Sequence, residues 1–229
     1  MPYEDLILPD VSALSIGILG GTGPQGRGLA YRWARAGHRV TLGSRDPQRA
    51  RDSAKALTGQ LTTDNAIAGS DNAGACDNDV VVVAVPWQGH RELLTGLTEA
   101  LRERIVVDCV NPLGFDAKGP YALPVAEGSA AQQAEQILAQ SRVTAAFHHV
   151  SAVTLADPTV DTVDTDVMVL GDDRDAATTV QALAARISGV RGIYAGRLRN
   201  AAQVEAMTAN LIAMNRRYKT HAGLRVSNL

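Results

Sequence analysis

One short segment near the N-terminus constrains the fold of this chain more than any other. A short apolar run at 15–20 precedes this segment. From residue 24 to residue 36, apolar side chains recur at helical spacing. The members of the segment form the pattern G-x-G-x-x-G and are Gly21, Thr22, Gly23, Pro24, Gln25 and Gly26. A strand, a glycine loop and a helix in this order are typical of a dinucleotide-binding βαβ unit.

Each glycine of this loop has its own physical reason. Gly21 is expected to allow the tight turn, Gly23 to let the backbone approach a pyrophosphate, and Gly26 to let the helix pack closely on the strand. The phosphates are then expected at the helix N-terminus, where free N–H groups and the helix dipole favour anions.

The end of the second predicted strand, at 39–43, distinguishes NADP from NAD. An NAD site has Asp or Glu about 20 residues after the loop, where it binds the ribose hydroxyls. This chain has Ser44 and Arg45 there, with Arg49 one helical turn later. Arginine binds phosphate in bidentate fashion, so the pattern favours the 2′-phosphate of NADP. The alternative is that both arginines are solvated surface charges, and Asp46 is expected in the first turn of the next helix.

Strands and helices alternate along most of the chain, which predicts an α/β fold with a Rossmann-type doubly wound parallel sheet. Strands are expected at 15–20, 39–43, 61–63, 79–85, 105–110, 143–147, 166–170 and 192–195. Helices are expected at 24–36, from 47, at 87–101, 129–140, 173–187 and 198–214. The Gly- and Pro-rich stretch between the fifth and sixth strands predicts a loop over 111–128.

The same pattern predicts three parts. Residues 1–14 are expected to form a short extension, 15–156 an NADP-binding Rossmann domain, and 157–229 a small C-terminal α/β domain. The last helix carries Val204, Met207, Leu211 and Met214 at helical spacing, so one face of it is expected to be core. Contact with a second subunit in a homodimer is the alternative use of this face.

Charge and composition exclude several classes of partner. The 229 residues carry a net charge of −2, which argues against nucleic acid binding. No apolar stretch is long enough to span a membrane, and the acidic N-terminus does not resemble a secretory signal. The two cysteines, Cys76 and Cys109, lack metal-ligand spacing and are expected to be buried free thiols, in agreement with a cytoplasmic protein.

Seven short segments occur along the chain in a characteristic order. They are Gly-Gly-Thr-Gly-Pro-Gln-Gly at 20–26, Gly-Ser-Arg at 43–45, Val-Pro-Trp at 85–87, Asn-Pro-Leu at 111–113, Ala-Phe-His at 146–148, Gly-Asp-Asp at 171–173 and Ala-Gly-Arg-Leu-Arg-Asn at 195–200. From about Leu14 to Leu229 the chain thereby resembles the F420-dependent NADP oxidoreductases, in which hydride passes between NADP(H) and the deazaflavin coenzyme F420. The family often has Ile-Pro where this chain has Val150-Ser151, and Pro-Leu-Ser-Asn at 197–200.

The resemblance implies a cleft that holds two coenzymes, NADP(H) and F420. The residues it assigns to NADP are Thr22, Gly23, Gln25, Ser44, Arg45 and Arg49, with Val85, Pro86 and Trp87 beside the nicotinamide and Asn111 in the same cleft. The residues it assigns to F420 are His148, Val150, Ser151, Ala152 and Met207. No metal is implied.

Hydride transfer between two bound rings needs little acid–base help, so the absence of a catalytic triad or carboxylate pair agrees with this chemistry. His148 is the one candidate for a catalytic residue, as a hydrogen-bond partner or proton donor of the deazaflavin. The structural alternative is that it caps the strand before it. The rival functions are an NADPH-dependent reductase of a flavin, a ferric chelate or a small imine, and a non-catalytic NADPH-binding sensor.

Overall fold

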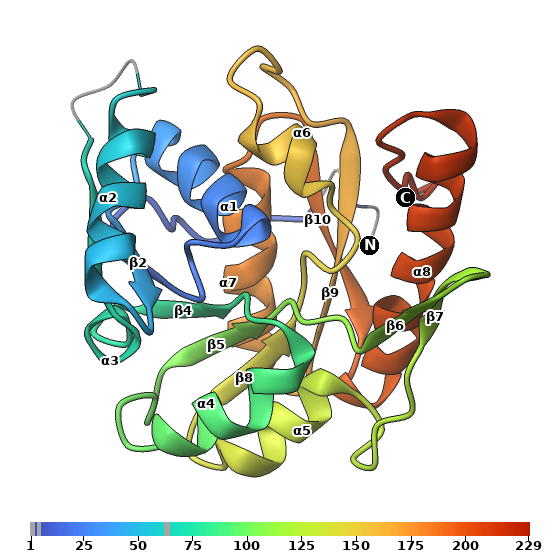
Figure 1. Ribbon diagram of the computed structural model, residues 1–229, viewed down its shortest axis with the longest axis horizontal. Coiled ribbons are helices and arrows are strands. Elements are labelled where there is room, and N and C mark those ends of the chain that lie inside the picture. Colours follow the sequence, from blue (N-terminus) through green and yellow to red (C-terminus); the bar gives the residue numbers. More distant parts are fainter. Residues whose placement is uncertain (1–2, 4–5, 62–64) are drawn as a thin grey trace.

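A computed structural model describes residues 3, 6–61 and 65–229, and its central feature is one eight-stranded sheet (Figure 1). The strands lie in the order β10-β9-β8-β5-β4-β1-β2-β3. Their bounds are β1 (Ile16–Leu19), β2 (Val40–Ser44), β3 (Ile67–Asp71), β4 (Val80–Val83), β5 (Ile105–Asp108), β8 (Arg142–Ala145), β9 (Thr165–Gly171) and β10 (Val190–Gly196). Every pairing is parallel except that of β8 with β9. The Rossmann-type α/β fold is therefore confirmed.

Helices cover both faces of the sheet. They are α1 (Pro24–Arg35), α2 (Pro47–Thr58), α3 (Asn72–Ala75), α4 (His90–Gly96), α5 (Ala130–Ile137), α6 (Ala152–Ala156), α7 (Arg174–Ala185) and α8 (Ala201–Tyr218), with short 3-10 helices η2 (Trp87–Gly89) and η3 (Leu198–Asn200). Alternate residues of the strands enter two cores. Ile18 and Val82 pack with the helices α1, α2 and α7, whereas Leu19 and Val83 pack with α4, α5 and the start of α8.

The strand order places a ligand-binding crevice before any side chain is considered. From β1 the chain proceeds to β2 and β3 on one side, and then returns to β4 and β5 on the other. Open α/β sheets bind ligands outside the carboxyl ends of their strands at such a reversal. The crevice therefore lies above the ends of β1 and β4.

The third strand differs from the expectation. The expected strand at 61–63 falls largely on 62–64, outside the described residues, and the strand that pairs with β2 is β3. Its residues Gly69-Ser70-Asp71 have low β propensity, so no local signal marks it. Gly69 is required there because a Cβ would lie 2.4 Å from the backbone of Ala50 in α2.

The loop expected at 111–128 contains a β-hairpin, so that expectation was wrong. Its strands β6 (Leu113–Asp116) and β7 (Gly119–Ala122) are antiparallel, and β7 contacts α8 (Figure 1). Gly114 lies opposite Tyr121, and a Cβ on Gly114 would lie 2.4 Å from Cζ of that ring. A tyrosine packed across a glycine stabilises this hairpin through cross-strand packing, which a sequence pattern does not reveal.

The C-terminal segment continues the same sheet through β9 and β10, and the domain boundary expected near 157 stays a prediction. The buried guanidinium of Arg32 in α1 donates to the carbonyls of Thr154, Leu155, Asp157 and Val160 at distances of 2.6 to 3.0 Å. These bonds satisfy carbonyls at the end of α6, which need partners outside the helix. One side chain thus joins the first helix to the segment around residue 157.

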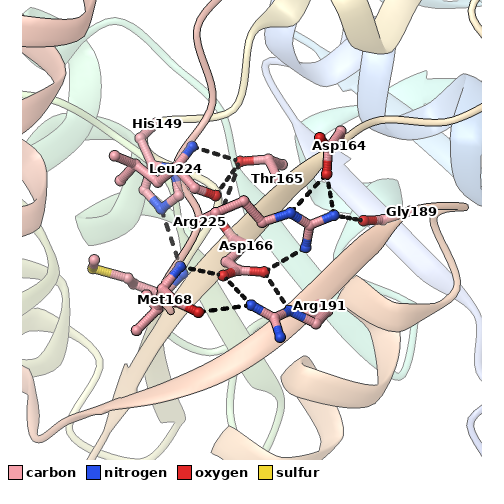
Figure 2. Close-up of polar contacts among 10 residues, drawn as sticks. His149, Asp164, Thr165, Asp166, Met168, Gly189, Arg191, Leu224 and Arg225 are labelled. Atoms are coloured by element: carbon pink, nitrogen blue, oxygen red, sulfur yellow. Dashed lines mark hydrogen bonds and ion pairs between the residues drawn. The ribbon is translucent and has the colours of Figure 1, made fainter. Parts of the chain in front are cut away.

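A buried carboxylate holds the chain terminus on β9. Asp166 accepts hydrogen bonds from Arg191 and Arg225 at 2.6 to 2.7 Å (Figure 2). It also accepts from the N–H of Val226 at 2.7 Å. Burial alone would raise the pKa of Asp166, but these donors lower it to about 2. The cluster fastens the last residues to the sheet far along the chain from the glycine loop.

The prediction that one face of the last helix is buried is confirmed only in part. Val204 and Leu211 are buried, Met207 is half-buried and Met214 is 41% exposed. The expectation for Met214 was wrong because α8 extends beyond the body that covers its first half. Both cysteines are buried and free, as expected.

Candidate active site

A first pocket opens at the carboxyl ends of β1, β2 and β4, with a volume of about 930 Å³. Its residues come from the glycine loop, the end of β2, α3, the end of β4 and α4. They are Gly20, Thr22, Gly23, Ser44, Arg45, Asp46, Arg49, Asn72, Ala84, Val85, Pro86, Gln88, Gly89, Glu92, Leu93, Gly96 and Leu97. This volume suits a ligand of dinucleotide size.

The glycines of the loop divide into packing positions and an open position. A Cβ on Gly21 would lie 2.8 Å from the carbonyl oxygen of Ile18, and a Cβ on Gly26 would lie 2.7 Å from the Cα of Gly21. Gly20, with a φ of 68°, makes the tight turn that the sequence analysis assigned to Gly21. Gly20 supplies the left-handed backbone of this turn, and Gly21 ends the same turn by donating its N–H to the carbonyl of Ile18.

At Gly23 the packing of the protein itself leaves room for a side-chain Cβ atom. The nearest atom to a Cβ there would be the carbonyl oxygen of Gly20 at 3.4 Å, an ordinary contact. Gly23 lines the pocket and precedes α1, whose first turn contains Pro24 and no acidic side chain. An open backbone at the positive end of a helix fits an anionic group such as a diphosphate.

The end of β2 presents two arginines to the same pocket. Arg45 and Arg49 are exposed and line it, and neither forms an ion pair among the described residues. Ser44 is buried, and its hydroxyl accepts from the N–H of Asp46. The carboxylate of Asp46 caps α2 by accepting from the N–H groups of Gln48 and Arg49. Two uncompensated guanidinium groups beside a hydroxyl suit a phosphate monoester.

Asn72 lines this pocket and was not anticipated from the sequence. Its Oδ1 lies 3.3 Å from the N–H of Gly20 and accepts a hydrogen bond from it. Asn72 is the first residue of α3, and it enters the site because β3 pairs with β2. Leu93 and Leu97 of the α4 region were also missed, since an amphipathic helix gives no signal for which residues reach a pocket rim.

A second pocket of about 380 Å³ adjoins the first. The two share the wall formed by Ala84, Val85, Pro86 and Gln88 directly after β4. The other lining residues of the second pocket are Gln25, Trp87, Cys109, Val110, Asn111, Leu113, Phe115 and His148. A ligand in each pocket would therefore meet the other across the segment that follows β4.

His148 is the buried polar side chain of the second pocket. It is 4% exposed, and neither ring nitrogen has a hydrogen-bond partner. Its own carbonyl accepts from Asn111 Nδ2 at 2.9 Å and from Thr208 Oγ1 at 3.1 Å. Burial lowers the pKa of His148 to about 4, and the charge of Asp108 opposes this only in part. A fixed backbone with an unpaired neutral ring is suited to hydrogen-bond a ligand.

Beneath the second pocket lies a buried ion pair that the sequence analysis did not find. His90 Nε2 donates to Asp108 Oδ2 at 2.6 Å, and Nδ1 donates to Gln133 Oε1 at 2.9 Å. Both side chains of the pair are fully buried. Burial alone would lower the pKa of His90, but Asp108 and the two hydrogen bonds raise it above its ordinary value.

This ion pair supports the walls of the second pocket directly. The other oxygen of Asp108 accepts from the N–H of Val110, and the ring of Trp87 lies 5.5 Å from that of His90. Asp108 thereby also makes a hydrogen bond in the loop that directly follows β5. The partner His90 stands 18 residues earlier on α4, so only the fold brings the two together.

Several residues expected near the second ligand lie outside both pockets. Ser151 caps α6 by accepting from the N–H of Thr154, and α6 packs against α1. Val150 is buried, whereas Ala152 and Met207 are half-buried. Their roles toward a ligand stay predictions.

Two further findings concern metal ligands and membrane-spanning helices. The part of the chain that the structure describes contains no group of three metal-ligating side chains. Within the same residues, no helix combines the length and apolar character needed to cross a membrane.

Comparison with known proteins gives consistent matches. A family described as NADP oxidoreductase, coenzyme F420-dependent, matches residues 15–112. The F420-dependent NADP reductase of Methanothermobacter thermautotrophicus is 38% identical over 96% of this chain and 97% of its own. The protein of the same name from Methanocaldococcus jannaschii is 35% identical over 94% and 99%. A crystal structure from Arthrobacter sp. FB24, assigned as an F420-dependent NADP reductase, has 26% identity, a TM-score of 0.79 and coverage of 94% and 100%.

Proposed function

Because the chain belongs to the family of F420-dependent NADP oxidoreductases, we propose that it is an enzyme that transfers a hydride between NADP(H) and F420. The observation that carries this proposal is the wall shared by the two pockets after β4. When both coenzymes are bound, the reaction is a direct hydride transfer between the nicotinamide and the deazaflavin ring. The task of the protein is to hold the two rings at reacting distance.

NADP is assigned to the first pocket. The open backbone at Gly23 and the N-terminus of α1 accommodate the diphosphate, and Arg45 and Arg49 bind the 2′-phosphate with Ser44 beside them. Val85 and Pro86 then separate the two ring sites. The exposed arginines support this direction of binding because they follow β2, whereas the shared wall follows β4 and β1 lies between these two strands.

F420 is assigned to the second pocket. Apolar side chains of the walls, Trp87, Leu113 and Phe115 among them, provide surface for a planar ring. His148 contributes a hydrogen-bond partner. Since the pKa of His148 is lowered to about 4, its ring is neutral at physiological pH, and this favours hydrogen bonding to the coenzyme over donation of a proton from an imidazolium.

The proposal is tested by mixing the protein with NADPH and oxidised F420 and following the visible absorbance of the deazaflavin. We expect that absorbance to disappear at a rate proportional to enzyme, and the reaction with NADH to be much slower. Tight NADPH binding without loss of the absorbance would contradict the proposal and leave a non-catalytic NADPH sensor. Turnover of FMN, a ferric chelate or an imine without turnover of F420 would identify one of the other reductase functions.

Two finer properties stay predictions from the sequence. These are assembly into a homodimer and location in the cytoplasm. Analytical ultracentrifugation of the purified chain at micromolar concentration tests the first, with a sedimentation mass of twice 24.1 kDa as the expected result.

A further inference from the structure

The side chain of Gln25 belongs to the second pocket although the residue stands in the glycine loop. It lies in the first turn of α1, next to Gly23 and Pro24, and the sequence pattern assigned it to NADP. Its side chain lines the second pocket and is absent from the lining of the first. Its Nε2 donates to the carbonyl oxygen of Phe147 at 3.0 Å, a contact across 122 positions of the chain.

Phe147 is the acceptor of this bond, and its backbone is strained. Its φ is 65°, a left-handed conformation that a bulky residue rarely adopts. Its ring is buried and packs edge-on against Trp33, with the ring centroids 5.3 Å apart at 89°. Such strain persists only where the surroundings hold the residue from several sides, and it concentrates at functional sites.

The strained residue sets the direction of the chain at His148. The carbonyl of Phe147 is held by Gln25, and the carbonyl of His148 is held by Asn111 and Thr208. The backbone is thereby fixed on both sides of the His148 Cα, while both nitrogens of the His148 ring remain without a partner. All the polar restraints are on the backbone, and the two ring nitrogens are buried without a hydrogen-bond partner.

We propose that Gln25 is a positioning residue for the second coenzyme: its amide holds the left-handed turn at Phe147 and so directs His148 into the second pocket. This rests on the proposed function, in which that coenzyme is F420. Gln25 therefore connects the loop that cradles the diphosphate with the residue that contacts the other ring. Its side chain acts through Phe147 and contributes nothing to NADP affinity.

The test compares Gln25→Met, which keeps the length and lacks the donor, with Gln203→Met on an exposed face of α8 as the matched control. For Gln25→Met we expect the KM for F420 to rise about tenfold, as for the loss of one partly buried hydrogen bond. The KM and Kd for NADPH should stay within about twofold of wild type. A rise in the KM for NADPH as large as that for F420, or no change in either, would overturn the proposal.

A second readout requires no F420, so the inference can fail independently of the proposed function. NMR titration of the holo-protein with NADP⁺ follows the ring of His148, identified by its loss in His148→Gln. In wild type the pKa of His148 should be about 4 because of burial, with the charge of Asp108 opposing and that of His149 assisting the shift.

In Gln25→Met the turn should loosen and admit water to the His148 ring, which raises its pKa toward the ordinary 6.5. His149, whose pKa burial also lowers to about 4, should not change, because its Nε2 accepts from the N–H of Met168 on β9. An unchanged pKa of His148 would overturn the positioning role. If wild type fails to reduce F420 and the His148 shift still appears, only the assignment of the coenzyme is lost.

Discussion

The two pockets of this protein share a wall but are built by different means. The first is made of short continuous segments, with Gly20, Thr22 and Gly23 on one side and Ser44 to Arg49 on the other. The second is made of side chains from distant parts of the chain, among them Gln25, Trp87, Asn111 and His148. The first is therefore a local motif placed on a sheet, and the second exists only after the sheet has formed.

The interactions that maintain the two pockets also differ, in that one depends on backbone packing and the other on side chains. The first pocket depends on the absence of side chains, since a Cβ at Gly21 or Gly26 would overlap neighbouring backbone. The second depends on buried polar groups that must all be satisfied, namely the pair His90–Asp108 and the restrained carbonyls beside His148. Loss of one member of a buried polar network costs more than the loss of a surface charge. The predictions below use this difference.

The largest effect is expected at the buried ion pair. Asp108→Asn should lower the free energy of unfolding by about 3–5 kcal/mol, because it leaves His90 without its counter-charge in a fully buried site. Urea denaturation measures this, with Asp77→Asn, an exposed partner of Arg104, as the control that should change stability by under about 1 kcal/mol. A loss as small as that of the control would show that the second pocket does not depend on this network.

Two glycines of the motif, Gly26 and Gly23, should separate an effect on stability from an effect on binding. Gly26→Ala should cost about 1–3 kcal/mol of stability, because the new Cβ would lie 2.7 Å from the Cα of Gly21. Gly23→Ala should cost under about 1 kcal/mol but raise the Kd for NADPH about tenfold or more, since its methyl group enters the open cradle. Thermal unfolding and NADPH fluorescence titration distinguish the two. Equal losses of stability would contradict the division into packing and open positions.

A more modest effect is expected at the rim of the first pocket. Arg45→Ala should reduce the preference for NADPH over NADH about 10- to 100-fold, which corresponds to about 1.5–3 kcal/mol for a charge-assisted hydrogen bond. The KM for F420 should not change. Arg51→Ala is the matched control, because Arg51 is exposed on the following helix α2 and does not line the pocket. An unchanged ratio of the two kcat/KM values would show that the phosphate binds elsewhere.

The smallest expected effect is a change of the free energy of unfolding with pH. The pKa of His90 is raised above 6.5 in the folded state, so its stabilisation is present below pH 6.5 and declines as the pH rises through the folded value. Urea midpoints between pH 6.5 and 9 should therefore fall in wild type and fall less in His90→Gln. Glu205 contributes a fall in stability mainly between about pH 4.5 and 7, since burial raises its pKa from 4.5 to about 7, and the variant Glu205→Gln isolates that part.

The pH slope has an opposing contribution at lower pH. His148 and His149 have a pKa of about 4 in the folded protein, so stability should rise as the pH increases from 4 to 6.5. A wild-type midpoint that keeps rising above pH 7 would contradict the role of His90 in the network. These measurements use the intact chain and need no coenzyme.

The parts of the site that could be predicted from the sequence are those in which local backbone chemistry determines the outcome. A glycine loop between a strand and a helix has one physical use that needs glycines at this spacing. The end of β2 could also be read, because Arg45 and Arg49 follow the strand directly. The strand β3 and the β6–β7 hairpin were missed since their stability comes from pairing and from Tyr121 on Gly114, which leave little local pattern.

The sequence by itself determined the alternation of most strands and helices, the nucleotide loop and the preference for a 2′-phosphate, because each depends on neighbours within a few residues. Only the tertiary structure decided that Gln25 faces the second pocket, that His90 pairs with Asp108, and that the ring nitrogens of His148 stay unpaired. These facts depend on which distant segments meet, and on how much water they exclude. Contacts of that kind are set by the packing of the whole sheet and its helices, which no stretch of the sequence contains alone.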